Sequence, residues 1–198
     1  MVKISRPTPK DAFLRHRLFD HLDQMRRFPV IWISAPAGSG KTTLVSSYIE
    51  DRNIPCLWYQ IDKGDADVAT FFYYMREAAK NASPRKRISL PLLTPEYLQG
   101  FSTFALRYFE HLYNRLKTPS ILVFDNYHEA PLDSPLHEVM SSAFSLLPEG
   151  INVVVMSRND PPATVARLRA NRSLALVRWE DIRLTNEEAR GMYQGSDQ

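Results

Sequence analysis

Short, mainly apolar runs alternate along the chain with stretches in which apolar residues recur every three or four positions. The runs are typical of strands buried on both faces of a parallel sheet, and they lie at 29–34, 55–61, 120–124, 151–156 and 174–177. Helical spacing predicts helices between them, at 12–25, about 41–48, 68–75, 101–116, 136–147 and 164–170. The pattern predicts an α/β fold with a doubly wound, mostly parallel five-stranded sheet and helices on both faces, because parallel strands need crossover connections.

Helix start signals refine this outline. Thr94 and Pro95 predict the start of one helix, with Thr as cap and Pro at the first helical position. Thr185 and Glu188 form the ends of a capping box that opens another helix, with ten residues left after it. We therefore expect an N-terminal segment and helix at 1–28 that pack on the functional site, a core at 29–180, and the start of a following helical domain at 181–198, as in a piece of a longer protein.

Composition narrows the class of protein. Of the 198 residues, 44% are hydrophobic and 24% are charged, which is typical of a globular chain. The longest uncharged runs fall short of the roughly 18 apolar residues of a membrane span, and the N-terminus lacks the apolar core of a signal peptide. We therefore expect a cytoplasmic protein without a membrane partner. The single cysteine, Cys56, permits no internal disulfide.

The net charge of +3 is unevenly distributed. Residues 1–30 carry seven Lys and Arg against three acids, and residues 119–198 carry seven against eleven. The basic excess near the N-terminus is placed to meet phosphates or to form an ordinary solvated surface. The acidic last third, without a basic recognition helix, predicts that DNA is bound only through a domain outside this sequence.

The first strand and the next helix are joined by Ala35-Pro-Ala-Gly-Ser-Gly-Lys-Thr-Thr43. This segment matches the phosphate-binding loop G-x-x-x-x-G-K-[ST], the Walker A motif, except that Ala35 occupies the first glycine position. Backbone N–H groups and the positive end of the following helix make such a loop a phosphate site. The fold is therefore predicted to be a P-loop NTPase, with these candidate nucleotide-binding residues: Ala37, Gly38, Ser39, Gly40, Lys41, Thr42 and Thr43.

Particular roles follow from the chemistry of these side chains. Lys41 is expected to bridge the β- and γ-phosphates of ATP, and the Thr42 hydroxyl to coordinate Mg²⁺. The apolar run 121–124 ends in Asp125, as in a Walker B motif, which places a carboxylate at the carboxyl edge of the sheet as a second Mg²⁺ ligand. Arg158 follows the strand 151–156 at the same edge, where it either contacts the γ-phosphate or forms an ordinary surface ion pair.

Hydrolysis needs a group that activates water. Asn126 follows Asp125 at the position where an acid often stands, and an amide orients water but cannot take its proton. Glu129 and His128 are substitute bases or solvated loop residues. Slow hydrolysis is therefore expected.

Other charged residues leave two interpretations open. Asp62 and Asp65, after the second strand, either position water or cap the following helix. The arginines upstream of the first strand either belong to a segment that folds over the nucleotide base or to the solvated surface: Arg6, Arg15 and Arg17.

Several segments together resemble the ATPase domain of the large ATP-binding LuxR-type (maltose-activator-like) transcriptional regulators, within the signal-transduction ATPases with numerous domains (STAND). The resemblance covers nearly all of the chain. These segments carry it: Ile4-Ser-Arg-Pro7, Leu14-Arg-His-Arg-Leu18, Ser34 through Thr43, Trp58-Tyr-Gln-Ile-Asp-Lys-Gly-Asp65, Leu122-Val-Phe-Asp-Asn-Tyr-His128, Val154-Val-Met-Ser-Arg158 and Ile182-Arg-Leu-Thr-Asn-Glu-Glu-Ala189.

The resemblance implies a switch that binds ATP or ADP, hydrolyses ATP slowly and self-associates when ATP is bound. It carries Lys41, Thr42 and Asp125 over as phosphate and Mg²⁺ ligands and Arg158 as γ-phosphate sensor. It also implies sensor and output domains beyond Gln198. Two alternatives stay open: a small-molecule kinase with a lid at Arg85-Lys-Arg87, and a nucleotide-binding module without turnover.

Overall fold

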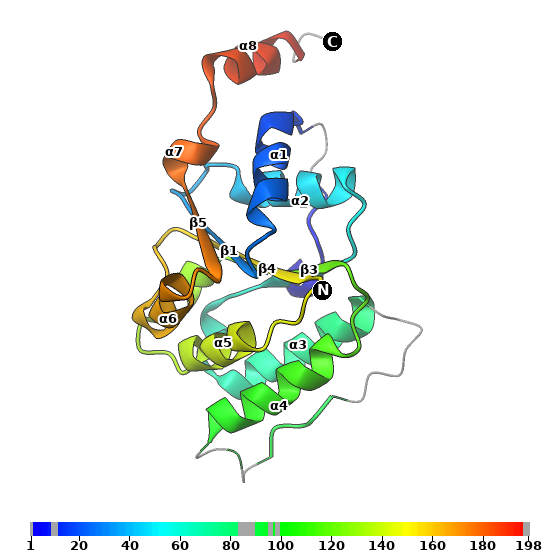
Figure 1. Ribbon diagram of the computed structural model, residues 1–198, viewed down its shortest axis with the longest axis vertical. Coiled ribbons are helices and arrows are strands. Elements are labelled where there is room, and N and C mark those ends of the chain that lie inside the picture. The colour runs from blue at the N-terminus through cyan, green and yellow to red at the C-terminus, as the bar shows by residue number, and fades with distance from the viewer. Residues whose placement is uncertain (1, 9–11, 83–89, 95–96, 98–99, 196–198) are drawn as a thin grey trace.

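The computed structural model describes residues 2–8, 12–82, 90–94, 97 and 100–195. Within them the chain forms a five-stranded, all-parallel sheet with the order β2-β3-β4-β1-β5 (Figure 1). The strands are β1 (Val30–Ser34), β2 (Cys56–Gln60), β3 (Ser120–Asp125), β4 (Ile151–Ser157) and β5 (Leu174–Arg178). This confirms the predicted fold class.

Helices cover both faces of the sheet. Figure 1 shows α1 and α2 on one face and α3, α4 and α5 on the other. The α-helices are α1 (His16–Met25), α2 (Lys41–Asp51), α3 (Val68–Ala82), α4 (Phe101–Tyr113), α5 (Leu136–Ser145), α6 (Ala166–Ala170), α7 (Trp179–Ile182) and α8 (Asn186–Gly195). Short 3₁₀ helices are η1 (Val2–Ile4), η2 (Lys63–Ala66), η4 (Tyr127–Glu129) and η5 (Ala163–Val165).

Two apolar cores result from the alternation of side chains along the strands. Trp32 of β1 and its neighbours on that face pack against α3, α4 and α5, in a core rich in aromatic rings. Ile31 and Ile33 face the opposite side and pack against Leu18 and Phe19 of α1 and against α2. Burial of a large apolar side chain stabilises a fold by about 1.5–3 kcal/mol, so both helical layers are firmly fixed to the sheet.

The strand order brings the segments that follow β1, β3 and β4 to one edge of the sheet. β4 lies between β1 and β3, and Ser34 at the end of β1 pairs with Ser157 of β4 and with Arg178 of β5. Because all strands are parallel, Ser34, Asp125 and Ser157 end at the same carboxyl edge. The phosphate-binding loop, η4 and Arg158 therefore emerge side by side.

Two helix starts differ from the sequence prediction. The first helix begins at His16, because Arg15 has non-helical backbone angles and residues 12–15 form no regular secondary structure. The fourth helix begins at Phe101 after Gly100, which is also non-helical, rather than at Thr94. Pro95 and the candidate lid Arg85-Lys-Arg87 lie outside the described residues.

The capping box is present as predicted. The Thr185 N–H donates to Glu188 Oε2 at 3.0 Å, and the Glu188 N–H donates to Thr185 Oγ1 at 3.2 Å. It opens α8, at the top of Figure 1.

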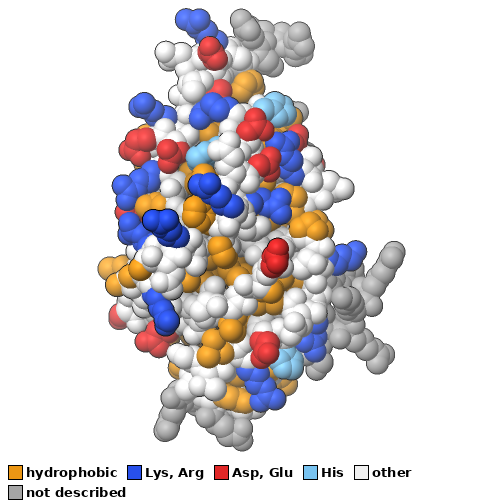
Figure 2. All heavy atoms as spheres, in the orientation of Figure 1, with side chains coloured by type: hydrophobic (Ala, Val, Ile, Leu, Met, Phe, Trp, Pro, Cys, Tyr) orange, Lys and Arg blue, Asp and Glu red, His pale blue; other side chains and the backbone are white. Residues whose placement is uncertain are grey.

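Charged side chains of both signs share the surface. On the face drawn in Figure 2, the Lys and Arg side chains of the described residues are interspersed with Asp and Glu over the upper half of the molecule. In the same described part of the chain, no helix combines the length and the apolar character that crossing a bilayer requires.

The segment after β2 is held by a buried carboxylate. Asp65 is fully buried and accepts hydrogen bonds from Lys3 Nζ at 2.8 Å, from the Tyr59 hydroxyl at 2.7 Å and from the Asp62 N–H at 2.9 Å. Asp62 in turn accepts from the Gly64 N–H at 2.9 Å and caps η2. Both aspartates are therefore capping and packing residues.

Replacement of Lys3 tests this arrangement. Lys3→Met removes the cation beside a buried carboxylate, so we expect the free energy of unfolding at pH 7 to fall by about 3 kcal/mol. Urea denaturation measures the loss. Lys63→Met, at an exposed lysine of η2, serves as control and should stay within about 0.5 kcal/mol of the wild type; equal losses in the two variants would contradict the role of Lys3.

Candidate functional site

The loop between β1 and α2 depends on two glycines. Gly38 and Gly40 have φ of 72° and 79°, in the left-handed region that side chains other than glycine rarely adopt. A Cβ built on either residue would meet no atom within 4 Å. The conformation, and not a lack of space in the loop, therefore requires glycine at both positions.

This conformation leaves a row of backbone donors without acceptors. No described residue accepts a hydrogen bond from the N–H groups of residues 38 and 40–43. They lie in the loop and in the first turn of an 11-residue helix, whose N-terminal end carries a partial positive charge. Such a concavity binds phosphate or another anion.

Lys41 lies folded onto the loop. Its ammonium donates to the Ala35 carbonyl at 2.7 Å, to the Pro36 carbonyl at 2.8 Å and to Ser39 Oγ at 3.1 Å. Burial lowers the pKa of Lys41, Asp125 opposes this effect, and Arg158 adds to it. The Lys41 ammonium is thus held at the loop by hydrogen bonds to carbonyl oxygens, and the oxygens of an anionic ligand can replace these as acceptors.

Thr42 and Asp125 meet across the sheet edge. The Thr42 hydroxyl donates to Asp125 Oδ2 at 2.9 Å, and the Asn126 N–H donates to Asp125 Oδ1 at 2.8 Å. The Asp125 side chain is almost completely buried, and burial raises its pKa, while the bonds from Thr42 and Asn126 and the charge of Lys41 lower it.

This oxygen pair fits Mg²⁺. Adjacent ligands of an octahedral ion with bonds of about 2.1 Å lie about 3 Å apart, close to the observed separation of the Thr42 and Asp125 oxygens. Mg²⁺ commonly takes one or two protein oxygens and completes its shell with phosphates and water. In the described part of the chain there is no cluster of three acidic, histidine or cysteine ligands, so phosphate oxygens would have to share the coordination.

Asn126 has a conformational role. Its φ is 57° and its ψ is 34°, a left-handed conformation that asparagine and aspartate tolerate better than most residues. The chain reverses here and enters η4, which contains both candidate bases of the sequence analysis, Glu129 and His128.

Arg158 projects from the neighbouring turn. Trp32 Nε1 donates to the Asn159 carbonyl at 3.0 Å, and the Asn159 N–H donates to Ser157 Oγ at 3.0 Å, so the turn is anchored to β1 and β4. The exposed Arg158 makes no hydrogen bond or ion pair with the described part of the protein, yet its charge acts on both Lys41 and His128.

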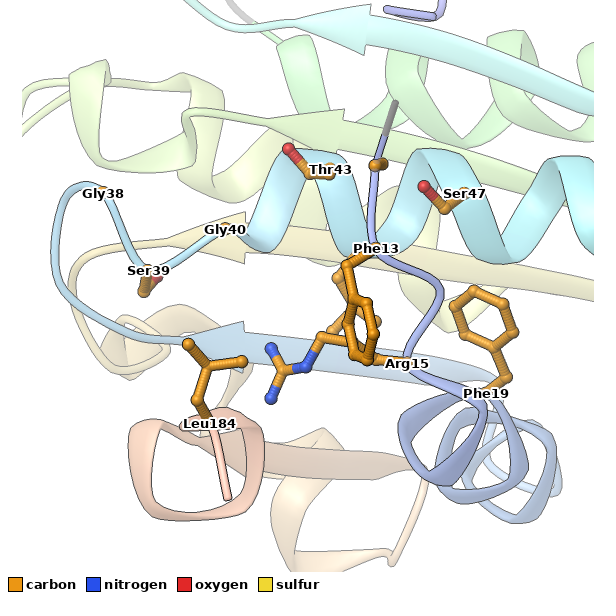
Figure 3. Close-up of a pocket in the computed structure, with 11 residues that line it drawn as sticks. Phe13, Arg15, Phe19, Gly38, Ser39, Gly40, Thr43, Ser47 and Leu184 are labelled. Atoms are coloured by element: carbon orange, nitrogen blue, oxygen red, sulfur yellow. The ribbon is translucent and has the colours of Figure 1, made fainter. Parts of the chain in front are cut away.

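A pocket of about 300 Å³ opens on the side of the loop that faces α1 (Figure 3). Its walls come from the loop, from α2, from α1 and the irregular segment before it, and from the segment before α8. Most of the lining surface is apolar, and the lining includes Phe13, Arg15, Phe19, Leu44 and Leu184. Figure 3 shows the Arg15 guanidinium pointing toward Leu184.

Arg15 joins two segments that are far apart in the sequence. Its guanidinium donates to the Ile182 carbonyl at 2.6 Å, to the Arg183 carbonyl at 3.0 Å and to Glu188 Oε2 at 3.0 Å. Its Nε is buried and has no partner among the described residues. Arg15 therefore fixes the wall of the pocket through its Nη2, and its Nε is a buried donor that the described residues leave unbonded.

The three arginines considered from the sequence lie in different places. Arg15 lines the pocket, whereas Arg6 donates to the Ser46 carbonyl at 3.0 Å on the flank of α2. Arg17 forms an ion pair with Glu188, in which its Nη2 lies 3.2 Å from Glu188 Oε2. Of these three, only Arg15 is placed to touch a ligand in the pocket.

Sequence reasoning missed the apolar walls of the pocket. Phe13 and Leu184 lie about 170 positions apart, and no spacing within either segment announces that they meet.

The structure brings the predicted loop, Lys41, Thr42 and Asp125 together, with Arg158 and Glu129 at the same edge. A comparison with known protein families matches residues 10–158 to the family described as Nephrocystin 3, N-terminal, which is most of the chain. The chain belongs to the Nephrocystin 3 N-terminal family. The range matched by the Nephrocystin 3 N-terminal family contains the loop and Asp125 and ends at Arg158. This match does not test the narrower resemblance to the LuxR-type regulators, which stays a prediction.

Glu188 provides a test of the contacts behind the pocket. Burial alone would raise the pKa of Glu188, but the Thr185 N–H and the guanidinium groups of Arg17 and Arg15 outweigh it and lower the pKa to about 2. A carboxyl group whose pKa is lowered by folding stabilises the fold above its unfolded pKa of 4.5, and this contribution is lost as the pH falls toward 2. We expect Glu188→Gln to lower the Tm at pH 7 by about 2–4 °C.

Thermal unfolding between pH 7 and pH 3 measures the effect. The difference between wild type and Glu188→Gln should be largest above pH 4.5 and should shrink below it, as the wild-type carboxylate takes up a proton. Glu187→Gln, at the exposed neighbour, is the matched control. A difference that does not change with pH would contradict the assigned ion pairs.

Proposed function

We propose that this chain is an ATP-binding, Mg²⁺-dependent switch domain that hydrolyses ATP slowly and belongs to a larger signal-transduction or transcriptional regulator. The resemblance to the STAND ATPases of the LuxR type supports the regulatory part. Self-association in the ATP state is part of the same proposal.

The observation that carries the proposal is the contact between Thr42 and Asp125. It joins the first turn of α2 to the end of β3, two segments 83 residues apart, beside a loop with five free N–H groups and a lysine. A triphosphate would take the N–H groups and the Lys41 ammonium, and Mg²⁺ would take the two oxygens. Lys41 then contributes charge that stays fixed during phosphoryl transfer.

The pocket beside the loop supports a nucleotide over a simple phosphate ester. It adjoins the loop and is lined by aromatic and aliphatic side chains, with few polar groups. A flat, mostly apolar base suits such a pocket, and Arg15, which lines it, supplies a guanidinium beside the place where the base would lie.

A switch requires that the ligand bind one arrangement of the chain better than another. One wall of the pocket is the segment 182–184, which Arg15 ties to the start of α8. A nucleotide that contacts Arg15 and Leu184 would favour the arrangement in which α8 is held as observed.

Lys41 tests the binding part of the proposal. Lys41→Ala removes a charged hydrogen-bond donor to phosphate, a contribution of about 1.5–3 kcal/mol, so we expect Mg-ATP and Mg-ADP to bind about 10- to 100-fold more weakly. Isothermal titration calorimetry measures both Kd values. The control is Lys117→Ala, at an exposed lysine near the opposite edge of the sheet; unchanged ATP binding by Lys41→Ala would refute the site.

Asn126 tests the turnover part. Aspartate tolerates the left-handed conformation of this residue, so Asn126→Asp should fold normally and place a carboxylate where it can accept a proton from water. We expect the single-turnover rate of ATP hydrolysis to rise roughly 10²-fold, with ATP affinity little changed. Asn126→Gly, which keeps the backbone conformation without a side-chain base, is the control, and an equal rise there would argue against general-base action.

A further inference from the structure

His128 is the residue whose hydrogen bonding is least satisfied. Six buried side-chain nitrogen and oxygen atoms in the described residues have no partner, and two of them are the ring nitrogens of His128. Its side chain is 9% exposed. A buried polar atom without a partner costs about 1–3 kcal/mol, so this ring is placed for a partner that the protein itself does not provide.

His137, a buried histidine near η4, shows the contrast. His137 is bonded on both sides, with Nδ1 2.9 Å from the Tyr127 hydroxyl and Nε2 2.8 Å from the Pro131 carbonyl. Tyr127 also packs edge-on against Trp32, with ring centroids 4.9 Å apart. His137 and Tyr127 thus anchor η4 in the core, whereas His128, the next residue along the chain from Tyr127, has no such anchor.

The charges around His128 are those of the candidate nucleotide site. Burial lowers the pKa of His128, and Arg158 and Lys41 lower it further, while Glu129 and Asp125 oppose them. Glu129 Oε1 lies 3.5 Å from Nε2, beyond a normal hydrogen bond. Position and charge therefore place a neutral imidazole among Lys41, Asp125 and Arg158.

A neutral imidazole has one N–H donor and one acceptor nitrogen. Phosphoryl oxygens accept hydrogen bonds, and Arg158 has guanidinium N–H groups without a partner in the described chain. A terminal phosphate between Arg158 and His128 would satisfy the ring N–H, and the guanidinium would be a donor for the other ring nitrogen. The phosphate would then be the partner of one ring nitrogen of His128, and Arg158, held by the same phosphate, would be the partner of the other.

We propose that His128 donates a hydrogen bond to the γ-phosphate and so distinguishes ATP from ADP. This inference rests on the proposed function, because it needs the nucleotide in the phosphate-binding loop. The β-phosphate is assigned to the loop, and Lys41 is expected to bridge the β- and γ-phosphates, whereas His128 lies on η4 beyond Asp125 and would reach only the γ-phosphate. ADP would therefore leave His128 as it is in the free protein.

Binding measurements test the assignment. His128→Phe keeps a ring but removes both nitrogens, and we expect the Mg²⁺ complex of the β,γ-imido analogue of ATP to bind about tenfold more weakly, with Mg-ADP unchanged. His128→Gln retains an N–H donor and should recover most of the preference for the triphosphate. His137→Phe, at the bonded histidine, should lower the Tm and leave the ratio of the two affinities as in the wild type.

A spectroscopic measurement on the wild type avoids dependence on a folded variant. In ¹⁵N-histidine spectra, the ring resonances of His128 should shift when the imido analogue is added with Mg²⁺ and should stay in place with Mg-ADP. Equal shifts with both nucleotides, or equal losses of both affinities in His128→Phe, would overturn the proposal. If Lys41→Ala loses both nucleotides while the affinity ratio of His128→Phe stays normal, only the role of His128 fails; if Lys41→Ala binds as the wild type does, the proposed function fails with it.

Discussion

The left-handed backbone at Gly38 and Gly40 is the constraint on which the site depends. It turns the chain from β1 into α2 within six residues and leaves the N–H groups of residues 38 and 40–43 without a carbonyl partner among the described residues. The same turn folds Lys41 onto the loop and aims Thr42 at Asp125. Without it, the parallel sheet would still have a carboxyl edge, but no group of donors would converge there.

The sheet order complements this turn. Since β4 lies between β1 and β3, the Thr42–Asp125 hydrogen bond crosses over an intervening strand, and the turn after that strand carries Arg158. Two aromatic anchors, Trp32 to Asn159 and Tyr127 to His137, fix the turns on either side. These buried aromatic residues thus fix the turns that carry Arg158 and His128 at the carboxyl edge of the sheet, where the proposed nucleotide would bind.

Much of this arrangement could be predicted from the sequence because it is encoded locally. The apolar runs gave the strands, and the run 121–124 with Asp125 after it gave the carboxylate at the sheet edge. The spacing of Leu14, Leu18 and Leu22 predicted a helix that starts too early: Arg15 is non-helical, and its side chain is bonded to the carbonyls of residues 182 and 183. Contacts between distant segments also decide which arginine lines the pocket and which histidine lacks partners, and no local pattern contains that information.

The pocket beside the loop is built from both ends of the described chain, since Phe13 and Leu184 face each other across it. A partly folded chain in which either end has come away retains the loop but has an incomplete pocket. A ligand held there would bind only the chain in which both ends are in place, so it would stabilise that state over the partly folded one, and the more so the higher its concentration.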